Sequence, residues 1–142
     1  MSALETCRKA FTALPALLEA EPHLIWRGRR FDCALMLEAG DARWHLRFRG
    51  GRIEEILEGD RLMRSWNAAL RASPEDWVEF WRPVPKVGFH DLFAIAKRGR
   101  LRIEGDLHPV FSNLQYVKDV MALPRAAGFG PAQDAPLTAG AA

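Results

Sequence analysis

Residues 31–49 alternate between apolar and polar side chains, and this alternation constrains the fold more than any other feature of the sequence. Two apolar runs flank the turn-forming string AGDA at 39–42: Phe31, Cys33, Leu35 and Leu37, then Trp44, Leu46 and Phe48. A period of two places alternate side chains on opposite faces of a β-strand. The two runs therefore predict an antiparallel hairpin with one apolar face and one basic face.

Further turns extend this pattern into a larger sheet. Gly50-Gly51 ends the second strand, and the run RIEEILEGD predicts a shorter strand in which Ile53 and Ile56 have opposite parity. The alternation resumes in a fourth run at Leu62, Trp66, Ala68 and Leu70. Because successive turns join these four strands, we expect them to form an antiparallel meander. Leu101–Glu104 predicts a fifth strand.

Helical spacing predicts four helices around these strands. Ser2 and Glu5 have the spacing of a capping box, ahead of a helix over 3–19 that Pro15 can bend. Ser73 suits the N-cap of a helix over 73–81, with Pro74 at its first position. A short helix over 89–98 can close in a left-handed cap at Gly99, and the spacing over 107–123 predicts the last helix.

These elements indicate one domain of 142 residues with an α+β fold. The expected architecture is a five-stranded, largely antiparallel sheet with helices packed on one face. Within it we distinguish an N-terminal helix at 1–20, a main unit at 21–123 and a tail at 124–142. The tail is rich in Ala, Gly and Pro and has no apolar period, so we expect it to be mobile.

Composition and charge exclude several classes of protein. Hydrophobic residues make up 49% and charged residues 27%, as in soluble globular proteins. A net charge of +2 is too weakly basic to indicate nucleic-acid binding by itself. No apolar run approaches the roughly 18 residues of a membrane span, and the N-terminus lacks the apolar core of a signal peptide. Two distant cysteines, Cys7 and Cys33, without a CxxC pair favour a reducing, cytoplasmic location.

Arginines gather around the first hairpin and suggest two interpretations. They are Arg27, Arg29, Arg30, Arg43, Arg47, Arg49 and Arg52. Such a face could hold phosphates of nucleic acid, anionic lipid or coenzyme A. The alternative is a solvated outer face, whose charge Asp32, Glu38 and Asp41 partly offset. We favour the solvated face, because no stacking aromatics interleave the arginines, and expect at most transient membrane contact.

Residues that could perform catalysis or bind metal form no recognisable motif. The four histidines, His23, His45, His90 and His108, lack HxH or HxxxH spacing. The serine elbow GxSxG, the P-loop and GxGxxG are also absent. We therefore predict no catalytic residue, no metal and no cofactor. A small enzyme using His90 or His108 beside a carboxylate is retained as an alternative.

Aromatic side chains are concentrated in one strand and two short helices. They are Trp66, Trp77, Phe80, Trp81, Phe89 and Phe93. Each such ring can bury about 150–250 Å². Two short helices joined by the break RPVP over an open sheet can enclose an apolar cavity for a hydrophobic ligand. The alternative is an ordinary core that the same rings fill.

The order of elements resembles the sterol carrier protein type two family, chiefly in WHLRFRGGRIEEILEG at 44–59 and GRLRIEGD at 99–106. In that family a strand, a Gly-containing turn and a second strand precede a helical lid, and a short strand ending in Gly-Asp leads into the final helix. Here these elements are Trp44–Leu57, Ser73–Arg98 and Leu101–Asp106. The resemblance spans roughly residues 21–123.

The resemblance implies a sheet covered by helices around an apolar tunnel that binds lipids without catalysis. The implied ligands are acyl chains, acyl-CoA, sterols or isoprenoid quinones. A bacterial branch implies accessory lipid-binding factors for ubiquinone synthesis, with a lipid-metabolising enzyme as partner. The lid RPVPKVGFHDLF is unusually aromatic and a peroxisomal tail is absent, so the ligand of the animal proteins does not carry over.

Our hypothesis is a non-catalytic lipid-binding protein whose pocket lies between the sheet and the helices of 74–98 and 107–123. The side chains expected to line it are Trp66, Leu70, Trp77, Phe80, Trp81, Phe89, Phe93, Leu114, Val117 and Met121. An alternative is a protein-interaction or accessory subunit module that uses the aromatic lid as a docking surface. That alternative predicts an exposed apolar patch rather than an enclosed cavity.

Overall fold

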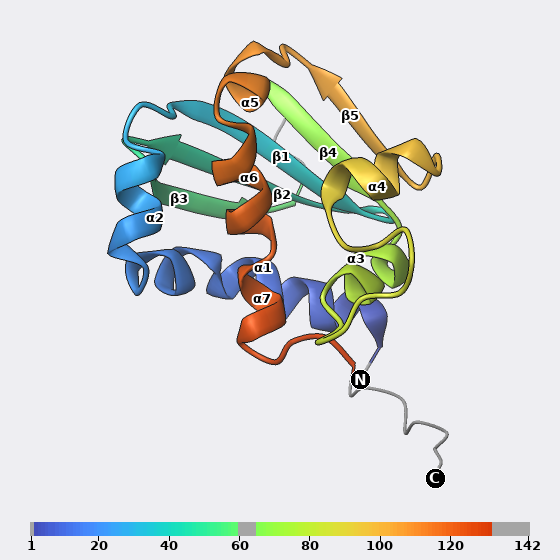
Figure 1. Cartoon of the computed structure of the whole chain (residues 1–142). Helices are drawn as coiled ribbons and strands as arrows, with labels where there is room; N and C mark the ends of the chain where they lie inside the picture. The colour runs from blue at the N-terminus through green and yellow to red at the C-terminus, as the bar shows by residue number, and fades with distance from the viewer. Residues whose placement is uncertain (1, 60–64, 132–142) are drawn as a thin grey trace, which may run out of the picture.

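The computed structural model describes residues 2–59 and 65–131, and a five-stranded sheet forms its centre (Figure 1). The strands are β1 (Cys33–Ala39), β2 (Ala42–Arg49), β3 (Arg52–Glu58), β4 (Ala68–Ala72) and β5 (Leu101–Gly105). They lie in the order β3-β2-β1-β4-β5, and only the β1–β4 pair is parallel. The predicted α+β class with a largely antiparallel sheet is confirmed.

The predicted four-stranded meander is wrong at its last strand. β4 does not follow β3 in the sheet but lies between β1 and β5. The consecutive residues Ala68, Ala69 and Leu70 are all fully buried, which suits a central strand covered on both faces. An edge position beside β3 would expose this backbone and one of its faces. Leu62, placed in the same predicted strand, lies outside the described residues.

A β-bulge explains the irregular parity of β3. Arg47 pairs with Glu55 and Phe48 pairs with Ile53, so Glu54 is an extra residue opposite this step. The bulge returns Ile53 and Ile56 to the same face, where they are partners of Phe48 and Leu46.

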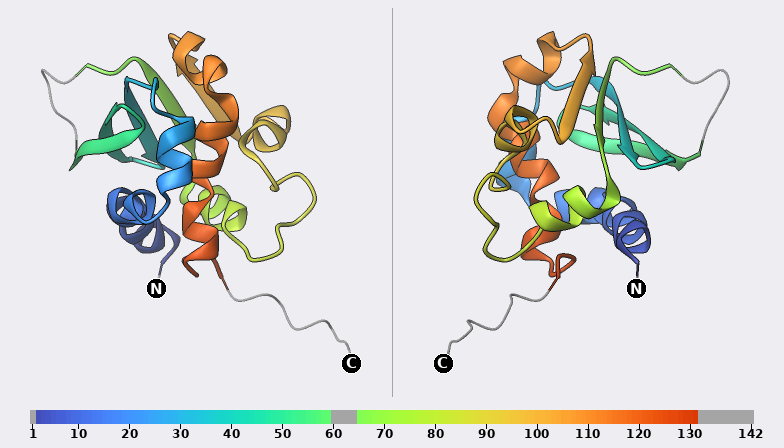
Figure 2. Two further views of the ribbon diagram at one scale, coloured as in Figure 1. Left: turned by 60° about the vertical axis from the view of Figure 1, so that its left-hand side comes forward. Right: turned by 90° about the vertical axis from the view of Figure 1, so that its right-hand side faces the viewer.

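The helices cover one face of the sheet (Figures 1 and 2). They are α1 (Ala3–Glu19), α2 (Pro22–Arg27), α3 (Pro74–Phe80), α4 (Leu92–Lys97), α5 (His108–Ser112), α6 (Leu114–Met121) and α7 (Leu123–Ala126). The predicted N-caps are confirmed: the hydroxyl of Ser2 accepts a hydrogen bond from Glu5 N, and that of Ser73 accepts one from Asp76 N. Pro15 lies inside α1, which continues to Glu19.

The prediction of a single last helix over 107–123 is wrong, because the segment forms α5 and α6 with a break at Asn113. The backbone of Asn113 has φ −128° and ψ 38°, outside the helical region. Its side-chain amide donates a hydrogen bond to the carbonyl of Pro109 at 3.0 Å, a local interaction that competes with helix formation. The segment that follows, predicted as a tail from 124, begins with α7, and residues 132–142 lie outside the described residues.

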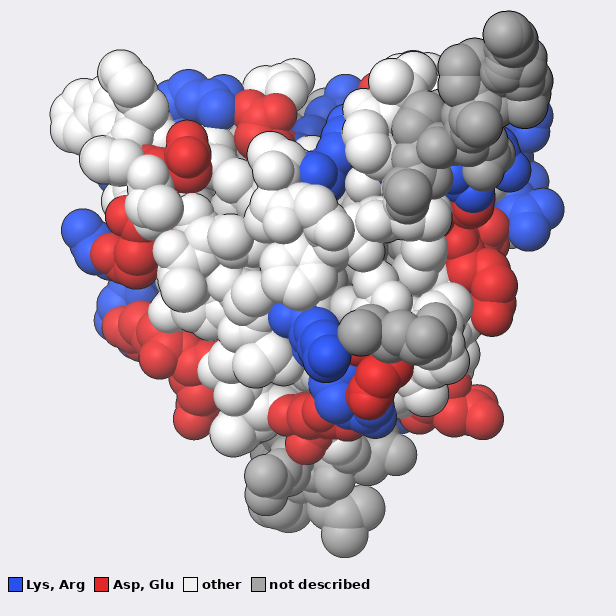
Figure 3. All heavy atoms as spheres, turned by 90° about the horizontal axis from the view of Figure 1, so that it is seen from below, with Lys and Arg blue, Asp and Glu red and all other residues white. Residues whose placement is uncertain are grey.

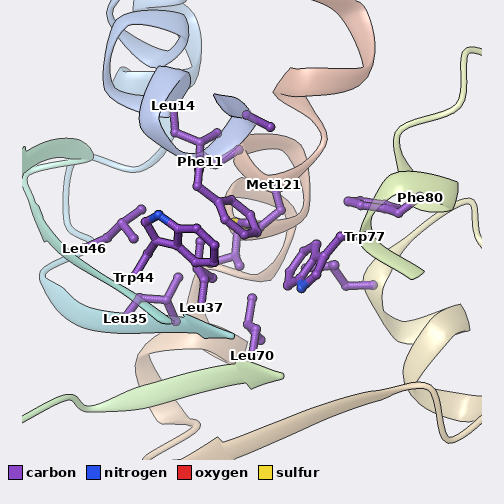
Figure 4. Close-up of a cluster of buried hydrophobic side chains, with 14 of the residues drawn as sticks. Phe11, Leu14, Leu35, Leu37, Trp44, Leu46, Leu70, Trp77, Phe80 and Met121 are labelled. Carbon is purple, nitrogen blue, oxygen red and sulfur yellow. The ribbon is translucent and has the colours of Figure 1, made fainter. Parts of the chain in front are cut away.

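A core of aromatic rings joins α1 to the rest of the domain (Figure 4). The ring of Phe11 lies 4.9 Å from that of Trp44, 5.2 Å from Trp77 and 5.4 Å from Trp81, all in edge-on geometry. One strand and two helices therefore meet at a single side chain. Edge-on pairs of this kind are typical of well-packed aromatic cores.

Candidate ligand-binding site

An apolar slot lies between α6 and the helix-covered face of the sheet. Its lining side chains come from β1, β2, α6 and the segment before β1: Phe31, Leu35, Phe48, Tyr116, Val117, Val120 and Met121. The slot is closed, because these side chains leave a free volume of about 0 Å³. The apolar pocket predicted between the sheet and the last helix is therefore not open in this structure, because the side chains that line this position fill it.

Tyr116 carries the only hydroxyl among the side chains that line the slot, and this hydroxyl is bound to the backbone at one end of the slot. The hydroxyl donates a hydrogen bond to the carbonyl of Gly51 at 2.6 Å, and burial raises the pKa of Tyr116 far above its usual value. The ring lies directly against Gly28, where a Cβ atom would stand only 2.2 Å from the ring. The phenol therefore stays neutral and locks α6 onto the β2–β3 turn.

Seven of the ten predicted lining residues belong to one continuous buried core. They are Leu70, Trp77, Phe80, Trp81, Phe89, Val117 and Met121. The indole nitrogen of Trp77 donates to the carbonyl of Glu38, and that of Trp81 donates to the carbonyl of Met121, both at 2.9 Å. Because backbone acceptors satisfy both nitrogens, the two rings are held inside and offer no exposed docking patch.

The other three predicted residues lie outside that core. Phe93 is half-buried and its ring packs against the half-exposed Phe111 at 5.7 Å, while Leu114 is half-buried at the start of α6. Trp66 lies on the opposite face of the sheet, where its ring is 5.6 Å from the guanidinium of Arg71. Arg71 follows the core residue Leu70 along β4 and so points away from the helices.

Five residues line the slot that were missing from the predicted set: Phe31, Leu35, Phe48, Tyr116 and Val120. The alternation over 31–49 already assigned the first three to the inner face of the hairpin. Their contact with the last helix could not be predicted from the sequence. Apolar periodicity assigns a side chain to one face of a strand but does not say which helix packs on that face.

Three of the four histidines lie at the surface, whereas His45 lines a small cleft with Ala34, Arg47 and Trp66. His23, His90 and His108 are exposed and His45 is half-buried. His90 lies 3.8 Å from the carboxylate of Asp91, and His108 lies 3.4 Å from the hydroxyl of Ser112, at exposed positions. Within residues 2–59 and 65–131 no group of three metal-ligating side chains is found. The exposed surroundings of His90 and His108 offer neither a desolvated base nor an enclosed substrate position.

The arginines near the first hairpin are largely held by carboxylates. Ion pairs join Arg27 to Asp119, Arg43 to Glu38, Arg49 to Glu54, and Arg52 to Glu19. Arg29 instead stacks over the exposed ring of Trp26 at 3.8 Å. On the face seen from below, Lys and Arg likewise alternate with Asp and Glu around a broad uncharged area (Figure 3). These pairs support the interpretation of a solvated, charge-balanced surface.

In the part of the chain that the structure describes, no helix has the length and apolarity needed to span a membrane. The longest helix, α1, has 17 residues and carries charged side chains along one side.

Comparison with known proteins finds similarity in structure only. No protein-family model matches the chain, and no curated protein matches it at a significant level. The crystal structure of sterol carrier protein 2 has a TM-score of 0.66 and 12% identity, over 82% of this chain and 94% of that one. The solution structure of the conserved hypothetical protein TT1886 from Thermus thermophilus, described as possibly a sterol carrier protein, has a TM-score of 0.57 and 13% identity, over 87% of each chain.

A third similar structure is the ubiquinone synthesis protein UbiJ-SCP2, with a TM-score of 0.54 and 21% identity, over 90% of this chain and 94% of that one. At such identities the likeness concerns the fold. It agrees with the resemblance seen in the order of elements. This chain therefore has the fold of the sterol carrier protein 2 domains.

Proposed function

We propose that this protein binds a hydrophobic lipid without catalysis, in the slot between α6 and the inner face of the sheet. The observation that carries the proposal is the slot itself, whose walls are apolar except for one satisfied hydroxyl. Acyl chains, acyl-CoA, sterol-like molecules and isoprenoid quinones all have the apolar surface that such walls would bury. The sterol carrier fold supports this assignment, because similar structures carry the names of a lipid carrier and of a ubiquinone synthesis protein.

We infer that the closed slot opens by movement of α6, because α6 supplies the four helical side chains that line it and is short. α6 has eight residues, and the backbone of Asn113, which precedes it, lies outside the helical region. The neighbouring helices α3 and α4 are also short, with seven and six residues. Isolated helices shorter than about 12 residues are marginal in water, so packing rather than helix propensity holds these segments in place. A lipid chain that replaces the same contacts gains about 25 cal/mol per Å² buried, offset in part by its own ordering.

The ten predicted lining residues enter this proposal with different weight. Val117 and Met121 belong to the slot, and the buried rings of α3 form the adjoining core into which a longer ligand would extend. Phe93 and Leu114 lie half-buried in the first turns of α4 and α6, and we propose that a ligand enters between these two turns. Trp66 has no part in it, because it lies across the sheet.

An accessory role is the finer part of the proposal. A protein that holds a lipid without reacting on it either transports the lipid or presents it to an enzyme of lipid or ubiquinone metabolism. UbiJ-SCP2 is named as a ubiquinone synthesis protein. The free, buried thiols of Cys7 and Cys33 suit a reducing, cytoplasmic setting. The alternatives have less support, because most of the aromatic rings, those of Trp77, Phe80, Trp81 and Phe89, are buried. His90 and His108 are exposed.

Ligand binding is tested first on the purified full chain. Native mass spectrometry followed by organic extraction should detect a co-purifying lipid, and fluorescent acyl or polyprenyl probes should bind. The absence of both a bound lipid and probe binding would contradict the proposal.

The location of the slot is tested by filling it. Val117→Phe adds a ring to the closed slot and should weaken binding of the fluorescent acyl or polyprenyl probe about tenfold or more. The matched control is Val87→Phe, since Val87 is 89% exposed and does not line the slot. Equal effects of the two substitutions, with both proteins folded by circular dichroism, would place the ligand elsewhere.

A further inference from the structure

A polar cleft of about 280 Å³ lies on the side of the sheet that faces away from the helices. Its lining residues are Glu38, Gly40, Arg71, Ala72, Ser73, Gly99, Arg100 and Arg102. They come from β1, β4 and β5 and from the turns that adjoin these strands at one end of the sheet (Figure 1). The volume is close to the roughly 300 Å³ at which small-molecule sites begin.

The α4–β5 junction is built to bring arginine to this cleft. Gly99 has φ +75°, its N–H donates to the carbonyl of Ala96, and the N–H of Arg100 donates to that of Ile95. This is a Schellman cap, which reverses the chain directly into β5. Arg102 then lies directly opposite Arg71 in the antiparallel register of β4 and β5. Two like charges in such a cross-strand pair repel each other unless anions lie close by.

Carboxylates supply part of that compensation and also orient the guanidinium groups. Glu104 contacts Nε of Arg71 at 2.8 Å and Nη2 of Arg102 at 2.7 Å, and Glu38 contacts Nη1 of Arg71 at 2.5 Å. Asp76, a buried residue of α3, contacts Nε of Arg100 at 2.8 Å. Arg100 is thus anchored through Nε, and its side chain is 57% exposed and lines the cleft.

The charge of the cluster is positive but small. Four guanidinium groups, including that of Arg43 beside Glu38, surround three carboxylates. Attraction by net charge alone would therefore be weak. The cleft can instead bind an anion through guanidinium N–H donors whose positions the carboxylates fix. The spacing of these donors matches the oxygens of phosphate or carboxylate groups.

We propose that this cleft binds a phosphate group through Arg100, Arg102 and the free donor positions of Arg71. The hydroxyl of Ser73, which accepts the cap hydrogen bond from Asp76 N, still has its own proton to donate. Glu38, which lines the cleft, opposes an anion together with Glu104 and Asp76 beside the guanidinium groups, and these carboxylates limit the affinity. The phosphate belongs either to a free phosphate ion or to the head of an anionic lipid. The site does not depend on the apolar slot, because the two lie on opposite faces of the sheet.

Titration calorimetry on the full chain tests the site with two probes. Inorganic phosphate tests the free ion, and short-chain phosphatidic acid, compared with phosphatidylcholine of the same chains, tests a lipid head. Binding of phosphate alone identifies the free ion, and preference for phosphatidic acid over phosphatidylcholine identifies a head group. Failure of both probes to bind would overturn the proposal, and binding of the acyl probe to the slot would be unaffected.

Two matched substitutions give the residue-level test. Arg100→Gln should weaken binding of the phosphate probe about tenfold, whereas Arg52→Gln should leave it unchanged. Both side chains are 57% exposed and each pairs with one carboxylate, so they differ mainly in location. Glu38→Gln should strengthen binding, because the amide no longer repels the anion while Glu104 still holds Arg71 through Nε. Equal weakening by Arg100→Gln and Arg52→Gln would show unspecific attraction and overturn the proposal.

Discussion

The indole nitrogen of Trp77 donates a hydrogen bond to the backbone carbonyl of Glu38 at 2.9 Å. This bond ties α3 to β1 from inside the core, where the Trp77 ring lies beside Phe11 (Figure 4). The side chain of Glu38 extends to the other face of the sheet and lines the polar cleft. One residue of β1 therefore supports the apolar core with its backbone and the charged cluster with its side chain.

Trp77→Phe should lower the free energy of unfolding by about 2 kcal/mol, because it removes a buried donor and part of a packed ring. Urea unfolding followed by circular dichroism measures the change. Trp26→Phe is the control, since Trp26 is 61% exposed and its substitution should cost little. A loss at Trp77 no larger than that at Trp26 would mean that the bond to Glu38 contributes nothing to stability.

Gly28→Ala should destabilise the fold by about 1–3 kcal/mol, because the new Cβ would lie 2.2 Å from the Tyr116 ring. The ring cannot move aside without breaking its hydrogen bond to Gly51. Gly28→Ala should lower the free energy of unfolding by less in a Tyr116→Leu background, since the leucine side chain is smaller than the tyrosine ring and leaves room for the new Cβ. Thermal unfolding of the four proteins forms a double-mutant cycle, and an additive result would contradict this contact.

The stability contributed by Glu79 should disappear in acid. A hydrogen bond from Arg82 lowers the pKa of Glu79 below the usual 4.5, with Lys86 acting in the same direction. A lowered carboxylate pKa stabilises the fold above the unfolded value, and this gain is lost as pH falls through the folded pKa.

Glu79→Gln should therefore lower the free energy of unfolding by about 1 kcal/mol or less near neutral pH, and the difference from wild type should shrink below about pH 4.5. Chemical unfolding at a series of pH values measures it. Glu21→Gln serves as control, because this exposed carboxylate makes no ion pair with the described residues. A difference that grows toward acid pH would reverse the assigned sign.

The two thiols should be unreactive while the protein is folded. Burial, with Glu75 adding to it, raises the pKa of Cys7 to about 12, and burial together with Asp106 raises that of Cys33 to about 11. A thiol reagent at mildly alkaline pH should therefore label neither residue, and both should react in concentrated guanidinium chloride. Cys7→Ser and Cys33→Ser assign each signal, and rapid labelling of the native chain would show that the core opens spontaneously.

Local features of the fold could be predicted from the sequence because they depend on residues a few positions apart. Ser73 caps α3 through its own neighbour Asp76, and Gly99 closes α4 by a bond to Ala96. The hairpin of β1 and β2 follows from alternation and one short turn. Asn113 shows the limit of periodicity, since one local hydrogen bond interrupts an otherwise regular apolar stripe.

The site could be predicted only in outline. Periodicity placed Val117 and Met121 on the inner stripe of the last helix, and both line the slot. The same reasoning placed Trp66 in the lining of the pocket, because the fourth strand was predicted to begin before Ala68, where β4 begins. The phosphate cleft had no sequence signal, since Arg71, Arg100 and Glu38 are far apart along the chain and meet only at the end of the sheet.

The sequence by itself therefore determined the class of the fold, its hairpin, its caps and the apolar face of its helices, because each depends on short-range hydrogen bonds and side-chain spacing. The tertiary structure decided that β4 pairs with β1, that Trp66 lies across the sheet from the slot and that the slot is closed. These outcomes depend on packing between distant segments, where the competing arrangements share the same local preferences and differ only in the surface that they bury together.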